Sequence, residues 1–135
     1  MMPITSEWVI EGLLLEQTYV GDISLEELVE ETGVATAALD SARGQHMYIL
    51  VDNSRTTSSP DNLKELRQIL PPVLRHPKLA MIVVSGQNNP LLRFVEQTIA
   101  AMFGIPLWFV ATRADALRYL AMTDRHIAAL LEDAS

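Results

Sequence analysis

The fold is decided by an apolar run and the polar segment that follows it, MYILV at 47–51 and DNSRTTSS at 52–59. The same order returns twice, with MIVV at 81–84 before SGQNN at 85–89 and LWFV at 107–110 before ATR at 111–113. Continuous apolar runs are typical of parallel strands buried on both faces, and the apolar-periodic helix after each run supplies the cover. Ligands and partners of such sheets usually meet the loops at the carboxyl ends of the strands. The sequence therefore predicts an α/β sheet, with any binding site at the carboxyl ends of its parallel strands.

Two further strands are expected before these runs, at Glu7–Glu11 and Leu13–Val20, meeting at Gly12. Their alternating apolar residues predict a hairpin-like start at the edge of a mixed sheet, and such an unpaired edge could meet another chain. A capping box, SLEE at 24–27, then opens a helix that Gly44 is expected to end.

Cap and breaker residues predict where the other helices begin and end. The second helix is expected to start with Ser59 as its cap and Pro60 at its first position, and to be interrupted at Pro71-Pro72. The third runs from an Asn89 cap and Pro90 to Gly104, and the fourth starts near Thr112 and restarts at Thr123 or Asp124. The prediction is a single domain over residues 1–135: a mixed, mostly parallel sheet of about five strands with about four helices, in the order β-β-α-β-α-β-α-β-α.

Charge and composition exclude several classes of function. The net charge is −7 and the ten basic side chains are scattered along the chain, which disfavours binding to nucleic acid or to an anionic membrane surface. No cysteine is present, so thiolate nucleophiles and thiolate metal sites are excluded. No apolar run approaches the roughly 20 residues of a membrane span, and the first residues lack the features of a secretory signal. We therefore expect a cytoplasmic protein without stable membrane insertion and without a cofactor.

The best candidate for a ligand site is the loop Ser85–Asn89, with Gln87 and Asn88 inside it. Gly86 permits close backbone approach, the positive end of the helix that opens at Pro90 points at the loop, and Arg93 could add charge. These features predict a pocket for a small anion such as a nucleotide, a phosphate or a lipid headgroup, with Asn53, Ser54 and Arg113 nearby on the same edge. The alternative is structural: Asn89 caps the helix and Asn88 turns the chain.

Asp52, at the end of its strand, also has two interpretations. It could face a ligand or a partner, or it could bond the amides of Asn53–Thr56 and hold the turn. No enzyme is indicated, because Ser85-Gly86 does not form a nucleophile elbow. The histidines at 46, 76 and 126 are far apart and have no metal-ligand spacing, so no metal site is expected. The acidic residues Glu26, Glu27, Glu30 and Glu31 have helical spacing and are expected to form a solvated face.

Four stretches carry a resemblance to a known family: YVGDISLEEL at 19–28, ILVD at 49–52, HPKL at 76–79 and NNPLLRFV at 88–95. Together with the order of elements, they resemble the STAS domain, the fold of anti-sigma-factor antagonists. The chain is more closely similar to the SpoIIAA-like and STAS/SEC14-like set of small bacterial proteins. The resemblance implies a STAS-like sandwich and a regulatory role in a bacterium, and it implies no reaction.

The resemblance also implies a place for a phosphorylation switch. Phosphorylated antagonists of this family carry an aspartate at the end of the middle strand and a serine at the start of the next helix. Here Asp52 and Ser54 fit the strand end, but the helix opens with SSPDNL at 58–63, which departs from the family motif. Ser58 and Ser59 are the weak candidates for modification.

Two hypotheses about function follow. The first is a non-catalytic regulatory or protein-interaction domain that binds a protein partner or associates with itself through the strand-end edge and neighbouring helix faces. The second is a domain that binds a small anionic ligand at the strand-end loops, through the residues named above.

Overall fold

In the part of the chain that the structure describes, five strands form one sheet, and their spatial order follows their order in the sequence. The structure is a computed structural model, which describes residues 3–42, 44 and 46–134. The first two strands pair antiparallel and every later pair is parallel, which confirms the predicted mixed, mostly parallel sheet with a hairpin at its edge. The strands are β1 (Ile4–Ile10), β2 (Leu14–Asp22), β3 (Met47–Ser58), β4 (Leu79–Ser85) and β5 (Leu107–Val110).

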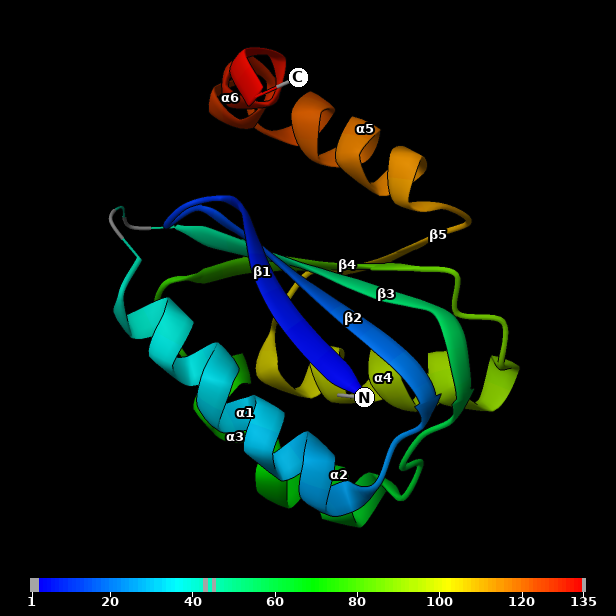
Figure 1. Ribbon diagram of the computed structural model, residues 1–135. Helices are drawn as coiled ribbons and strands as arrows, with labels where there is room; N and C mark the ends of the chain where they lie inside the picture. Colours follow the sequence, from blue (N-terminus) through cyan, green and yellow to red (C-terminus); the bar gives the residue numbers. More distant parts are fainter. Residues whose placement is uncertain (1–2, 43, 45, 135) are drawn as a thin grey trace.

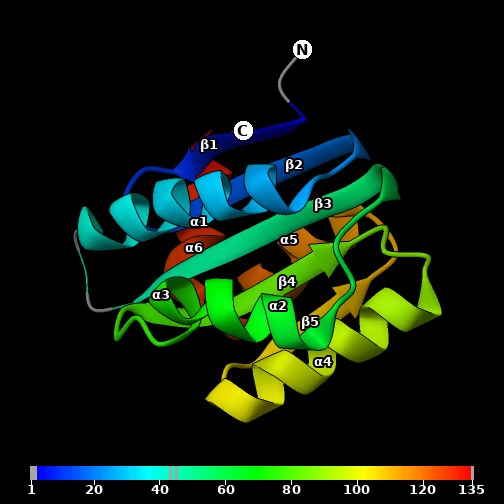
Figure 2. The same ribbon diagram turned by 90° about the horizontal axis from the view of Figure 1, so that it is seen from below.

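Helices cover both faces of this sheet. Figure 1 shows the first four helices on one face and the last two on the other, and Figure 2 shows the same layers from below. No helix in the described part of the chain has both the length and the apolar composition that crossing a bilayer requires. The helices are α1 (Leu25–Asp40), α2 (Leu63–Ile69), α3 (Pro71–Leu74), α4 (Pro90–Phe103), α5 (Arg113–Thr123) and α6 (Arg125–Ala134).

The middle strand, β3, is buried on both of its faces. Ile49 packs into the core under α1–α4, together with Leu39 and Ile99. Its neighbour Leu50 points the other way, into a second core cluster with Leu120 and Ile127. Because successive side chains of a strand alternate between faces, a strand between two cores needs apolar residues at every position. The continuous apolar run MYILV meets this need, and its interpretation as a doubly covered strand is confirmed. The run LWFV differs, because it forms the edge strand β5, where Trp108 is 50% exposed.

The caps predicted for α1 and α4 are present where they were expected. The Glu27 amide donates to Ser24 Oγ at 3.1 Å, and the Ser24 amide donates to Glu27 Oε1 at 2.8 Å, which completes the capping box. Asn89 caps α4 by accepting the Leu91 amide at 3.0 Å, and Gly104 ends that helix with a φ of 70°. Each of these contacts lies within a few residues in the sequence, so the local pattern is sufficient to predict it.

The segment after residue 51 differs from its prediction. Residues 52–58 were expected in a loop, but β3 continues to Ser58 because β2 continues beside it, with Val20 opposite Arg55 and Asp22 opposite Ser58. The following helix begins at Leu63 with Asn62 as its cap, and not at Pro60 after Ser59. Asn62 Oδ1 accepts the Glu65 amide at 3.0 Å, so the true cap lies three residues later than predicted.

Residues 3–42, 44 and 46–134 contain six helices, where about four were expected. Pro71 interrupts the predicted second helix, as expected, and the two pieces are α2 and α3. The predicted fourth helix stops at Thr123 and restarts at Arg125, which gives α5 and α6. The first helix ends at Asp40, before Gly44, with Ser41 as its carboxyl cap.

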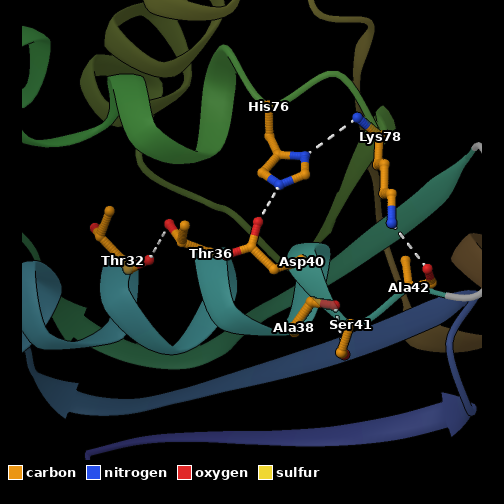
Figure 3. A network of polar contacts seen from close by, with 8 residues as sticks. All are labelled: Thr32, Thr36, Ala38, Asp40, Ser41, Ala42, His76 and Lys78. Carbon is orange, nitrogen blue, oxygen red and sulfur yellow. Dashed lines mark hydrogen bonds and ion pairs between the residues drawn. The ribbon is translucent and has the colours of Figure 1, made fainter.

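A polar network fastens the end of α1 to the turn before β4, as Figure 3 shows. His76 Nε2 lies 2.8 Å from Asp40 Oδ1, and the Lys78 amide donates to His76 Nδ1 at 3.2 Å. Because Nδ1 accepts, the ring proton lies on Nε2 and is donated to the carboxylate. The Lys78 ammonium adds a bond to the Ala42 carbonyl at 3.0 Å. Two segments that are distant in sequence are thereby joined at one end of the layer of α1–α4.

We expect the substitution His76→Ala to lower the free energy of unfolding by about 1 kcal/mol, because it removes two hydrogen bonds of a mostly buried ring. Chemical denaturation monitored by circular dichroism measures the change. His126→Ala, at an exposed position on α6, is the control and should change stability by less than about 0.5 kcal/mol. Equal effects of the two substitutions would contradict a fastening role for His76.

Candidate functional site

The carboxyl ends of β3, β4 and β5 bring the predicted segments together at one edge of the sheet. Asp52 is the sheet neighbour of Ser85, and Ser85 is the neighbour of Val110. The Gly86 amide donates to the Val110 carbonyl at 3.1 Å, which holds the start of the candidate loop against β5. The polar segments predicted at this edge therefore lie beside one another. We call this surface the strand-end edge, and its residues are Asp52–Ser54, Ser85–Asn89 and Arg113.

Gly86 allows two backbones to come very close at this edge. Its φ is +74°, and a Cβ added to it would lie 2.7 Å from Ser54 Cβ and 2.8 Å from Ser54 Cα. Only glycine adopts this conformation without cost and leaves room for the neighbouring chain. Gly86 thus permits a close backbone approach, and the group that approaches it is the end of β3 at Ser54; a role of Gly86 in binding a ligand stays a prediction.

The residues on β3 bond mainly to their own segment. Asp52 Oδ1 accepts the Ser54 amide at 2.9 Å and the Ser54 hydroxyl at 2.7 Å. These bonds agree with the structural interpretation, in which Asp52 holds the turn that follows it. Asn53 is buried, and its side-chain oxygen accepts the Thr56 hydroxyl at 3.2 Å. These contacts shape the end of β3, and a role of Asp52, Asn53 and Ser54 in binding stays a prediction.

The loop between β4 and α4 is also bonded internally. Gln87 donates to Glu96 Oε1 at 2.8 Å and accepts the Asn89 amide at 3.3 Å, whereas Asn88 is exposed. The Arg93 guanidinium lies 4.8 Å above the centre of the Phe109 ring. The loop is therefore bonded to the Glu96 carboxylate, and the nearby Arg93 guanidinium is stacked on Phe109. Binding of an anion here stays a prediction.

Arg113 joins the last strand to the second one. Its Nε and one terminal nitrogen donate to the two carboxylate oxygens of Glu16, at 2.7 and 3.0 Å. This two-point contact, followed by the charge of Glu16 and that of Asp52, raises the pKa of Arg113. The guanidinium therefore already has a geometrically matched anionic partner on β2.

The weak phosphorylation candidates lie at the far end of β3. The Ser58 hydroxyl donates to Asp22 Oδ1 at 2.8 Å, and Thr57 donates to the same oxygen at 2.7 Å. These two bonds lower the pKa of Asp22. A phosphate on Ser58 would break this bond and face a carboxylate. Modification of Ser58 or of Ser59, the next residue, stays a prediction.

Ser85 carries an unusual buried hydroxyl. The side chain is 1% exposed, and its Oγ has no hydrogen-bond partner among the described residues. Its neighbour Val84 points toward α1–α4, so alternation along the strand directs Ser85 to the face covered by α5. The hydroxyl therefore lies on the opposite face from the cavity described next.

A cavity of about 150 Å³ lies between the sheet and the helices α1–α4. Its walls are mostly apolar, with polar side chains from both the strands and the helices. Glu31 of α1 and Glu96 of α4 both line it, as do Gln17 and Tyr19 of β2. The polar lining residues are Gln17, Tyr19, Glu31, Thr32, Asn53, Ser59 and Glu96.

The position of Glu31 corrects its sequence interpretation. Glu31 was expected on a solvated acidic face, but it is 8% exposed and accepts hydrogen bonds from Ser6 and, at 2.7 Å, from Gln17. The signal was present in the spacing: Leu28, Glu31 and Ala35 are three and four residues apart and share one helix face. The hydrogen bonds from the Ser6 hydroxyl and the Gln17 side-chain amide offset the free-energy cost of burying this carboxyl group.

Glu96 was not singled out in the sequence. It lies four residues after Leu92 and three before Ile99, on the buried side of α4. Burial raises the pKa of Glu96 to about 7, against the lowering effects of the Gln87 hydrogen bond and the Arg93 charge. Burial likewise raises the pKa of Glu31 despite its hydrogen bonds. Burial raises the pKa of Tyr19 far above its usual value, and the charges of Glu31 and Glu96 add to this shift.

A metal site finds no support in this arrangement. Within residues 3–42, 44 and 46–134, no group of three or more His, Asp and Glu side chains could hold a metal ion.

Comparison with known proteins gives a result for the structure and none for the sequence. No protein-family model matches the sequence, and no curated protein matches it. The anti-sigma factor antagonist SpoIIAA in its unphosphorylated form is similar in structure, with a TM-score of 0.62 and 12% identity, over 87% of this chain and 96% of that one. An uncharacterized Shewanella loihica protein with a SpoIIAA-like fold has a TM-score of 0.60 and 19% identity, over 87% and 91%.

A third solved structure is the phosphorylated form of the Bacillus cell fate determinant SpoIIAA. Its TM-score is 0.58 at 12% identity, and the similarity covers 87% of this chain and 98% of that one. Identities this low establish the fold alone. The chain has the SpoIIAA-like fold of STAS domains, as the resemblance in its sequence predicts.

Proposed function

We propose that the chain is a non-catalytic regulatory domain that acts by binding a protein partner through the outer face of α4. The observation that carries the proposal is an exposed apolar stripe on this helix. Leu91 is 54% exposed, Phe94 66% and Met102 49%, and their spacing places them on the same side of the helix. Large apolar side chains gathered on one surface are typical of an interaction site.

The α4 stripe, defined as Leu91, Phe94 and Met102, is continuous with the strand-end edge. Helix α4 starts directly after the Ser85–Asn89 loop and lies beside β5 at the border of the sheet (Figure 2). A partner on the stripe would therefore also reach the loop, where Asn88 is exposed. This position supports the expectation that neighbouring helix faces take part in binding.

The chemistry of the partner follows from the surface and from the charge of the chain. Helix α4 has two charged residues: Arg93, which is stacked on Phe109, and Glu96, which lines the cavity. The stripe itself is uncharged in a chain of net charge −7. We propose a partner surface with a central apolar group to cover Phe94 and basic side chains around it. The similarity to an anti-sigma factor antagonist supports a role through protein contacts.

The experiment compares Phe94→Glu with Ala129→Glu. Both add one negative charge at an exposed helix position, but Ala129 lies on α6, on the other face of the sheet. We expect wild type and Ala129→Glu to retain the same protein from a lysate of the source organism, and Phe94→Glu to lose it. Titration with the purified partner should then show a loss of roughly 30-fold in affinity, as for a central interface residue.

Two outcomes would overturn the proposal. One is a partner that binds Phe94→Glu as tightly as wild type, since the stripe then takes no part in the contact. The other is a dimer of the wild-type chain, measured by sedimentation, that Phe94→Glu dissociates, because the stripe would then be covered by a second copy.

A further inference from the structure

The cavity under the sheet has the size of a small ligand and a largely apolar wall. Its volume is about 150 Å³, and strands and helices contribute aliphatic side chains from all sides. An engineered apolar protein cavity of this volume binds benzene, so the space suits a six-membered carbon ring. The apolar lining includes Leu28, Ile49, Leu66, Val84 and Ile99.

The charged groups on the cavity wall are both negative. Glu31 enters from α1 and Glu96 from α4, and no lysine, arginine or histidine is among the described residues that line the cavity. Glu96 Oε1 accepts a hydrogen bond from Gln87, and its Oε2 accepts none from the described residues. Glu96 is also only partly buried, whereas Glu31 is buried and bonded to Ser6 and Gln17. Glu96 is therefore the carboxylate that a ligand in the cavity can reach.

We propose that this cavity binds a small primary amine, with its ammonium group paired with Glu96 and a ring-sized apolar body against the aliphatic wall. An ammonium satisfies a carboxylate that is otherwise costly to hold in an apolar setting. An anion would be repelled by Glu31 and Glu96, and a neutral ligand would leave the carboxylate uncompensated. This site is distinct from the α4 stripe, so its failure and that of the proposed partner surface are separate results.

Binding should depend on pH in a definite direction. Glu96 must be ionised to pair with the amine, and burial raises its pKa to about 7. An alkylammonium group resembles that of lysine, whose pKa is about 10.4, and therefore stays charged between pH 6 and pH 8. The charged or titratable groups around Glu96 are Arg93 on its own helix, Glu31 on α1 and Tyr19 on β2. Affinity should therefore rise between pH 6 and pH 8.

The test uses cyclohexylamine, with cyclohexanol and cyclohexanecarboxylate as ligands of the same body and different head groups. Methyl NMR signals of Ile49, Ile99 and Val84 are followed during titration of the wild-type protein at pH 8. We expect saturable shifts with the amine, and affinities lower by roughly tenfold or more for the alcohol and the acid. Equal binding of amine and alcohol, or no shift of these methyl groups with the amine, would overturn the proposal.

Two variants then assign the contact to Glu96. Glu96→Gln keeps the shape of the side chain and should lower the affinity for cyclohexylamine roughly tenfold, with its pH dependence lost. Glu65→Gln removes the same charge from an exposed position on α2 and should bind as wild type does. An unchanged affinity in Glu96→Gln would place the amine elsewhere. If Glu96→Gln does not fold, the comparison of head groups on wild type still decides the proposal.

Discussion

The substitution Gly86→Ala is expected to lower the free energy of unfolding by about 3 kcal/mol. Part of the cost, about 1–2 kcal/mol, comes from placing a side chain on a residue whose φ is +74°. The rest comes from the new methyl group, which would lie 2.7–2.9 Å from the Cβ, Cα and amide nitrogen of Ser54. Because two of these atoms belong to the backbone of β3, the strand end must move as a whole. The strand-end edge would lose its geometry together with stability.

The control for this prediction is Gly104→Ala. Gly104 has nearly the same φ, +70°, but a Cβ there meets nothing within 4 Å. Its substitution should cost only the backbone strain, about 1–2 kcal/mol. Denaturant unfolding of both variants isolates the contribution of the contact with Ser54. Equal losses would show that the closeness of Gly86 to β3 carries no energetic weight.

The substitution Glu96→Gln is expected to raise the free energy of unfolding by about 2–3 kcal/mol at pH 8 and to leave it almost unchanged at pH 4. Burial raises the pKa of Glu96 from 4.5 to about 7 in the folded protein. At pH 4 the group is protonated in both states, so its ionisation costs nothing. As the pH rises from 4.5 to 7, the unfolded chain releases this proton first, and the folded state loses stability relative to it. Above pH 7 the full cost is present, and glutamine removes it.

Urea unfolding at several pH values between 4 and 8 measures this difference directly. Glu65→Gln, exposed on α2, should change stability by less than about 0.5 kcal/mol at every pH. A gain in Glu96→Gln that is the same at pH 4 and pH 8 would contradict an ionisation cost and would indicate a change in packing. The stability lost to an ionised Glu96 is what an amine bound in the cavity would restore.

Much of the candidate site could be predicted from the sequence because its position depends on strand order. Parallel strands joined by helices present their carboxyl ends at one edge, so Asp52, Ser85 and the Thr112-Arg113 segment had to lie on the same side of the molecule. Their partners could not be predicted. Glu16, which holds Arg113, lies on β2, 97 residues away in the sequence, and no local pattern links the two.

The sequence by itself determined the elements whose cause is local. The doubly buried strands follow from apolar runs, and the starts of α1, α4 and α5 follow from capping residues. The break between α2 and α3 follows from Pro71. Each of these features depends on neighbours within a few positions in the sequence. The tertiary structure alone decided the length of β3, which continues only because β2 lies beside it. It also decided the burial of Glu31 and the partial burial of Glu96. The helix period shows which residues share a face, but it does not show whether the opposing layer fills the space. Here it leaves a cavity, and two carboxyl groups that could have met water line that cavity instead.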